Sequence, residues 1–188
     1  MGEMLTRLER KELSIKGINV TVDKQQGVVR FEKDTKCMNV VFDPTLMLPA
    51  VEGECLLGNA LGQTRQHAQR LGTFLSLSSA AIVGITTGFK VDLEIKGTGF
   101  KVASKTVDGK IVLVFQLGYS NETKYVMPSN VLVKITTPTQ LSLESIDKQA
   151  LGQVSANIRR LRKVNPYKGK GILVKGQVLI LKETKKKK

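Results

Sequence analysis

The fold is decided most clearly by residues 145–166, which read SIDKQALGQVSANIRRLRKVNP. Apolar side chains recur within this stretch at the spacing of one helix face, and that spacing predicts a helix with a buried side. They are Leu151, Val154, Ile158 and Leu161. Ser145 or Asp147 can cap the N-terminus of this helix, and Pro166 predicts that it ends before that residue. A helix with one apolar face needs a sheet or another helix to cover it.

Short strands are expected before this helix, because β-branched and aromatic residues form runs that turn-forming residues interrupt. The expected strands are 91–95, 100–104, 111–117, 131–136 and 141–143. Gly97 and Gly99 join the first two strands, and Asp108-Gly109 is a strong signal for a hairpin turn. The second half of the chain therefore predicts several short strands followed by one helix.

The first half repeats this order. Apolar residues alternate over 15–22, a polar turn follows at 23–27, and 28–31 forms the return strand of a hairpin. A third strand is expected at 38–42 and a helix over 63–85, while the pattern at 44–62 assigns no element. Residues 71–89 carry no charge and are long enough to cross a bilayer. Their glycines, serines and threonines favour a buried helix over a membrane span.

Strands followed by a helix, twice in succession, indicate an internal duplication. The predicted fold class is α+β, with two tandem small domains, each an antiparallel β-sheet with a helix packed on one face. We expect an N-terminal domain over 1–88, a C-terminal domain over 89–176 and a basic tail over 177–188.

The charge of the chain is concentrated in its second half. The 188 residues include 30 basic and 16 acidic side chains, a formal net charge of +14. Residues 1–88 hold 10 basic and 9 acidic side chains, whereas residues 89–188 hold 20 and 7. This asymmetry favours a polyanionic partner, with nucleic acid first and an acidic membrane surface second. A basic surface without a partner is the remaining alternative.

The basic residues gather near the end of the last predicted helix. Four of them are expected in its last turn, where cations complement the helix dipole. They are Arg159, Arg160, Arg162 and Lys163. Dipole stabilisation explains one or two such residues, so four together favour binding of an anion.

The next residues, 165–171, read NPYKGKG. The glycines allow close approach to another backbone, and Lys168 and Lys170 supply compact positive charges. Tyr167 offers a ring for stacking, and the amides of such a loop can bind phosphate oxygens. An ordinary flexible loop is the alternative. The terminal lysines can release counterions from a nucleic acid, or form a solvated tail.

Catalytic chemistry has little support in the sequence. His67 is the only histidine, which excludes a site with several histidine ligands. Asp92 and Glu94 alternate along an expected strand, as on a solvated sheet face. Gly97-Thr98-Gly99 lacks the third glycine of a dinucleotide motif, and Cys37 and Cys55 lack a metal-binding spacing. We expect no enzyme activity, cofactor, metal or small-molecule substrate.

Residues 147–171 resemble a known family. Their pattern, DKQxxGQxxAxIR followed by PYKGKG, is similar to that of the large-subunit ribosomal protein number six family of bacterial type. Upstream segments resemble the same family in the same order. These segments are 82–89 (IVGITTGF), 97–101 (GTGFK) and 117–120 (LGYS). The likeness is good over about residues 65–175.

This resemblance implies two homologous α+β domains, the second of which binds large-subunit rRNA near the sarcin–ricin loop and the elongation-factor site. The implied partners are rRNA, neighbouring ribosomal proteins and nearby translation factors, without a membrane. The implied role is structural, bracing RNA helices. The implied contact residues are Lys96, Arg159, Arg160, Arg162, Lys163, Tyr167, Lys168, Gly169, Lys170, Lys185, Lys186, Lys187 and Lys188.

The sequence also departs from the family pattern. Gly176-Gln177 stand where an Asp-Glu pair is usual, Lys24–Gly27 replace a glycine-rich hairpin, and Asn121 stands where a histidine is common. These departures predict an organellar version in the mitochondrial matrix, with the bacterial cytoplasm as the alternative. Glutamates among the N-terminal basic residues do not favour a transit peptide. A peripheral membrane protein and a small enzyme are the other hypotheses. A peripheral membrane protein needs apolar side chains beside its basic residues to insert into the membrane, and none are evident in the sequence. An enzyme needs a convergent polar site, which the sequence does not indicate either.

Overall fold

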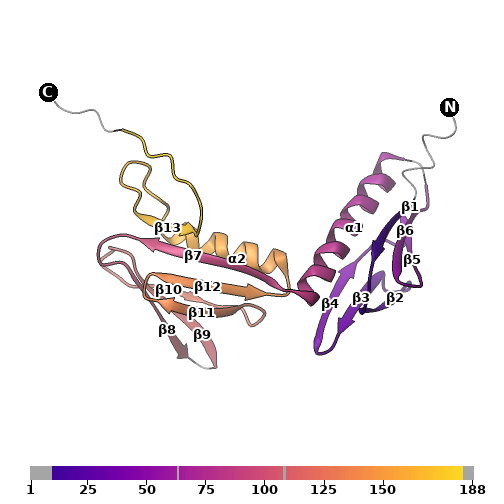
Figure 1. Ribbon diagram of the computed structural model, residues 1–188, viewed down its shortest axis with the longest axis horizontal. Helices are drawn as coiled ribbons and strands as arrows, with labels where there is room; N and C mark the ends of the chain where they lie inside the picture. The colour runs from indigo at the N-terminus through magenta and orange to yellow at the C-terminus, as the bar shows by residue number, and fades with distance from the viewer. Residues whose placement is uncertain (1–9, 63, 108, 184–188) are drawn as a thin grey trace. The chain divides into compact units, whose positions relative to one another are not determined.

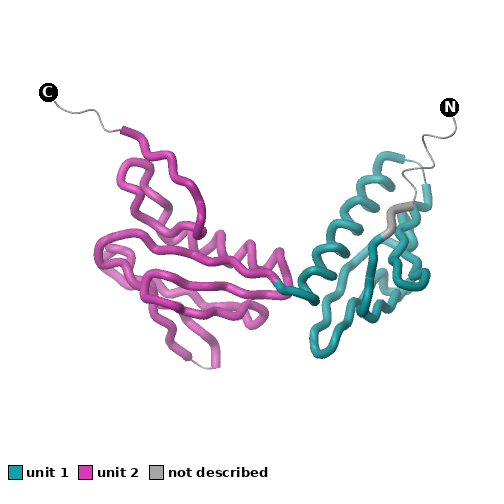
Figure 2. Tube along the Cα trace, viewed as in Figure 1, with its two compact units in different colours: residues 1–88 teal, residues 89–188 magenta. Residues whose placement is uncertain are grey.

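The computed structural model describes residues 10–62, 64–107 and 109–183. Contacts divide the chain into unit 1, residues 1–88, and unit 2, residues 89–188 (Figure 2). Each unit combines antiparallel strands with one helix in its described part, so the α+β class and the tandem arrangement are confirmed. Within each unit the strands are divided between two small sheets. Most of the N-terminal segment on which the transit-peptide argument rests lies outside the described residues.

Unit 1 contains six strands followed by a helix (Figure 1). They are β1 (Arg10–Ser14), β2 (Asn19–Asp23), β3 (Val28–Lys33), β4 (Lys36–Val41), β5 (Met47–Glu52), β6 (Cys55–Ala60) and α1 (Arg65–Thr86). The predicted hairpin at 23–27 is confirmed, with Val22 opposite Val29. The Asp23 carboxylate accepts hydrogen bonds from the amides of Gln25 and Gln26 and so closes the turn. The sheets have the orders β1-β6-β5 and β2-β3-β4.

Helix α1 covers these sheets mainly through β3, β4 and β6. Its buried residues are Leu71, Phe74, Leu75, Ser78, Ala81, Gly84 and Ile85. Phe74 meets Phe42 edge to face, with ring centroids 6.0 Å apart. The expectation of a buried helix in this uncharged region is confirmed. In the described parts of the chain, no helix has the length and apolar character needed to cross a membrane.

The pattern at 44–62, which assigned no element, corresponds to the hairpin of β5 and β6. Pro49 lies inside β5, and proline is normally a signal against a strand because it donates no hydrogen bond. Here it is tolerated because β5 lies at the edge of its sheet, beside β6 alone. Gly53 supplies the positive φ of the turn, at 59°.

Unit 2 contains six strands, a helix and a final strand (Figure 1). They are β7 (Phe89–Lys96), β8 (Lys101–Val107), β9 (Lys110–Gln116), β10 (Thr123–Val126), β11 (Leu132–Thr137), β12 (Gln140–Ser145), α2 (Lys148–Leu161) and β13 (Gly171–Val174). The predicted hairpin at Asp108-Gly109 is confirmed, since Val107 pairs with Lys110. The sheets have the orders β11-β12-β7-β13 and β10-β9-β8, so β7 and β8 belong to different sheets.

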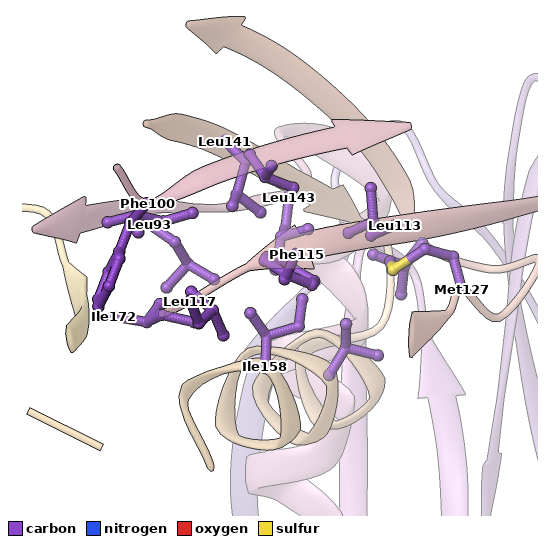
Figure 3. Close-up of a cluster of buried hydrophobic side chains, with 14 of the residues drawn as sticks. Leu93, Phe100, Leu113, Phe115, Leu117, Met127, Leu141, Leu143, Ile158 and Ile172 are labelled. Atoms are coloured by element: carbon purple, nitrogen blue, oxygen red, sulfur yellow. The ribbon is translucent and has the colours of Figure 1, made fainter. Parts of the chain in front are cut away.

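The core of unit 2 lies between α2 and the strands (Figure 3). Leu151, Val154 and Ile158 are buried as their spacing predicts, and Leu161 packs partly buried against the same cluster. Ile158 on α2 and Phe115 on β9 are both fully buried. Of the two possible caps, Asp147 is the N-cap, and its carboxylate accepts a hydrogen bond from the Gln149 amide at 2.8 Å.

Strand β13 was not expected, because residues 171–174 follow a loop and are short. It pairs antiparallel with β7, with Gly171 opposite Lys96. This pairing brings the end of the loop at 165–170 to the end of β7. It therefore determines which side chains surround the loop.

Candidate nucleic-acid interface

The basic residues at the end of α2 occupy two different backbone settings. Arg159 and Arg160 lie in the last helical turn, as predicted. Arg162 is the C-cap, with extended backbone at φ −145° and ψ 94°, and Lys163 follows it. The expectation that all four lie in the last turn was therefore wrong for Arg162 and Lys163. The helix ends at Leu161, earlier than Pro166 alone requires.

Arg162 is held in place by aromatic rings. Its guanidinium carbon lies 4.5 Å from the centroid of the Tyr119 ring and 6.0 Å from that of Phe100. The Tyr119 hydroxyl donates to the Leu161 carbonyl at 3.4 Å, and the Ile172 amide donates to the Arg162 carbonyl at 3.1 Å. A stacked guanidinium keeps its in-plane N–H groups for an anion. Sequence reasoning did not connect Phe100 or Tyr119 with Arg162, although both lie in the segments that resemble the family.

A shallow cavity of 360 Å³ lies beside the end of α2, between Arg159, Arg160 and Lys163. Arg159 donates from Nη2 to the Gln177 side chain at 3.3 Å, while its Nε is buried without a hydrogen-bond partner among the described residues. Arg160 and Lys163 are exposed. Three cations therefore line this cavity together with apolar side chains, and these cations can attract an anion.

The loop at 165–170 is closed by its own hydrogen bonds. The Asn165 side chain accepts from the amides of Tyr167 and Lys168, at 2.8 and 3.1 Å. The Gly169 amide donates to the Asn165 carbonyl, and the Asn165 amide donates to the Lys170 carbonyl, both at 2.8 Å. Gly169 has a φ of 67°, which glycine adopts without strain. This network favours a formed loop that presents its lysines over an unstructured one.

A second, open cavity of 720 Å³ lies between this loop and the end of β7, where Lys96, Lys168 and Lys170 converge. Lys170 Nζ donates to Thr98 Oγ1 at 3.4 Å. Lys96 is about half exposed and lies 3.6 Å from the Glu94 carboxylate, a surface pair that contributes little stability. Tyr167 is 51% exposed on the same loop. The structure thus brings Lys96 to the loop across a long sequence separation.

Most of this positive charge is not neutralised within the described chain. Apart from Lys96, six of the predicted contact residues that the structure describes are cations, and within the described residues none of these six has a carboxylate at ion-pair distance. These six are Arg159, Arg160, Arg162, Lys163, Lys168 and Lys170. The predicted contacts at Lys185, Lys186, Lys187 and Lys188 lie outside the described residues. We call Lys96 and these six cations, together with Tyr167 and Gly169 of the loop, the basic surface.

The carboxylates of β7 have structural partners. Ser142 on β12 donates from Oγ to Asp92 at 2.6 Å, and this bond lowers the pKa of Asp92 below its ordinary value. Lys90 lies 3.7 Å from the same carboxylate. In unit 1, the His67 ring nitrogen Nδ1 lies 2.6 Å from Thr64 Oγ1 at the start of α1. No group of three potential metal ligands occurs among the described residues.

Comparison with known proteins identifies what the chain resembles. The sequence model of the family described as Ribosomal protein L6 matches residues 97–175. A large ribosomal subunit protein uL6 from Paracoccus denitrificans is 35% identical over 97% of this chain and 100% of its own length. The uL6 proteins of Mycoplasma capricolum and Spiroplasma citri are 35% and 34% identical, each over 96% of this chain and 98% of their own lengths. These relatives are bacterial, so the mitochondrial expectation has no support from them.

Proposed function

The chain belongs to the ribosomal protein L6 family, and we propose that it is a constituent of the large ribosomal subunit that binds rRNA through its basic surface. It is a structural protein and not an enzyme. Its compartment is then the bacterial cytoplasm, in agreement with the bacterial relatives. Its contribution to translation is to brace RNA rather than to transform a substrate.

The observation that carries this proposal is the set of six cations that have no carboxylate partner among the residues that the structure describes. Helix α2 carries Arg159 and Arg160, two aromatic rings hold Arg162, and the closed loop carries Lys168 and Lys170. Each phosphate that such a cation neutralises releases a counterion, which makes binding favourable and dependent on salt. A surface of this kind positions an RNA backbone, whereas base specificity needs further contacts.

The RNA region is proposed from the family resemblance. The sarcin–ricin loop and the elongation-factor site are its expected surroundings, with neighbouring ribosomal proteins and translation factors close by. Tyr167 supports a single-stranded or looped RNA element, because its exposed ring can stack on an unpaired base.

The proposal is tested by charge reversal on the basic surface. Arg160→Glu with Lys170→Glu should weaken binding to purified large-subunit rRNA about tenfold or more, and should reduce the salt slope by about two. The measurement is affinity at several KCl concentrations. The matched control is Lys24→Glu with Lys36→Glu, which changes the net charge equally but alters two exposed lysines of unit 1.

Equal losses in the two double variants would show that total charge matters and the basic surface does not. Sedimentation of cell extract tests the assignment to the subunit itself. The wild-type chain should migrate with large subunits in moderate salt, and migration apart from ribosomes would contradict the proposed function.

A further inference from the structure

The segment after β13 exposes apolar side chains in a way that the basic surface does not explain. Val178 is 87% exposed and Ile180 is 89% exposed, more than any other large apolar side chain of the described residues. Leu179, between them, is partly buried. Over residues 178–180 this alternation is that of an extended chain, and the next residue, Leu181, is 52% exposed. No charged residue occurs from 176 to 181, although Lys175 and Lys182 flank the run.

The segment is held against unit 2 (Figure 1). The Gln177 amide donates to the Val174 carbonyl at 3.0 Å, and the Lys182 amide donates to the Pro166 carbonyl at 2.9 Å. Between these anchors, Leu179 and Leu181 line the cavity beside the loop. Leu181 Cδ2 lies 3.5 Å from the point where a Cβ on Gly169 would be. The segment is therefore anchored at both ends, which lowers the entropy cost of binding.

The main chain of residues 178–181 has no main-chain hydrogen-bond partner in the described part of the protein. An extended segment with free donors, free acceptors and outward apolar side chains has the properties of an exposed sheet edge. Another extended polypeptide can bind beside such an edge as an added strand. Its main chain then forms hydrogen bonds with the edge, and every second side chain contacts the same face.

We propose that residues 177–182 are a docking strand on which an extended segment of a second protein adds as a β-strand. Apolar side chains of that segment cover Val178 and Ile180. Carboxylates flank those apolar side chains, because Lys175 and Lys182 stand on either side of the uncharged run. RNA is less suited to this run, since the outward aliphatic side chains offer neither charge nor a ring to stack on. This inference rests on the proposed function in one respect: it takes the second protein to be a neighbour in the large ribosomal subunit.

The test places a photo-cross-linker in the full chain as Val178→benzoylphenylalanine, in the cells that make the protein. After irradiation, we expect a cross-link to one protein, which mass spectrometry maps to a segment with alternating apolar side chains. Amide exchange at residues 178–181 should be at least about tenfold slower in isolated subunits than in the free chain. The control is Val41→benzoylphenylalanine, at a 72% exposed valine of unit 1, which should not reach that segment.

Support requires both the mapped cross-link and the slower exchange. A cross-link to rRNA or to a second copy of this chain, no cross-link, or unchanged exchange would overturn the docking strand. Sedimentation of the same sample distinguishes failure of the docking strand from failure of the proposed function. A chain that migrates with large subunits but fails these criteria overturns the docking strand alone, whereas a cross-linked complex away from ribosomes contradicts the proposed function.

Discussion

Gly171 shows how one residue positions the basic surface. Its φ of 147° is a conformation that side chains with a Cβ rarely adopt. A Cβ there would lie 2.6 Å from Val164 Cα and 2.9 Å from the Lys163 carbonyl oxygen, both main-chain atoms. Only glycine therefore lets β13 begin directly against the segment that leaves α2. This contact closes the loop that carries Lys168 and Lys170.

We expect Gly171→Ala to destabilise the protein by about 1–3 kcal/mol, the usual cost of a strained backbone conformation. Urea unfolding measures the change in the free energy of unfolding. The matched control is Gly152→Ala on α2, where a Cβ meets no atom within 4 Å. That control should stabilise the helix by up to about 1 kcal/mol. Two alanine variants of equal stability would contradict this account of Gly171.

Helix α2 links the core of unit 2 to the basic surface. One face carries Leu151, Val154 and Ile158 into the core, and its last turn carries Arg159 and Arg160 at the negative end of the helix dipole. Its N-terminus is capped by Asp147. Ser145 accepts a hydrogen bond from the Asp147 amide and donates one to the Asn130 carbonyl, so the cap is also tied to the preceding loop.

Asp147→Ala should lower the free energy of unfolding by about 1 kcal/mol, because it leaves the Gln149 amide without its cap. Asp147→Asn keeps a side-chain oxygen at the same position and should retain most of the stability. Thermal and urea unfolding of both variants, followed by circular dichroism, make the comparison. If asparagine costs as much as alanine, the negative charge is the stabilising feature and the cap bond is not.

At the scale of the whole molecule, charge and core are both partitioned between the two units. The cluster that buries Phe115 and Ile158 draws all its residues from unit 2, between Leu93 and Ile172. The surplus positive charge of the chain lies in the same half. The stability of unit 2 and the geometry of its basic surface therefore depend on one core.

Ile158→Ala should cost about 2–5 kcal/mol, since it leaves a cavity among fully buried side chains. Hydrogen exchange should show faster exchange in β9, while the amides of β3 in unit 1 keep their protection. Leu132→Ala is the control, because Leu132 is 62% exposed and its truncation should change stability by less than about 0.5 kcal/mol. Equal loss of protection in β3 would show that the units unfold together.

Much of the fold could be predicted from the sequence. The apolar spacing of Leu151, Val154 and Ile158 predicted the buried face of α2, and the turns at 23–27 and Asp108-Gly109 predicted two hairpins. The grouping of Arg159, Arg160, Arg162 and Lys163 predicted where cations gather. All these features depend on residues close together in the chain, whose spacing and turn chemistry can be read without knowing the rest of the fold.

Only the tertiary structure decided how distant segments meet. Pro49 made β5 hard to predict, because proline is tolerated in a strand only where that strand lies at a sheet edge. Residues 171–174 form β13 because they pair with a free edge of β7. Lys170 reaches Thr98, 72 residues earlier, and Arg162 stacks on Tyr119. The physical reason is that strand pairing and side-chain stacking depend on which edges and faces remain available after the other elements have packed, which local sequence does not encode.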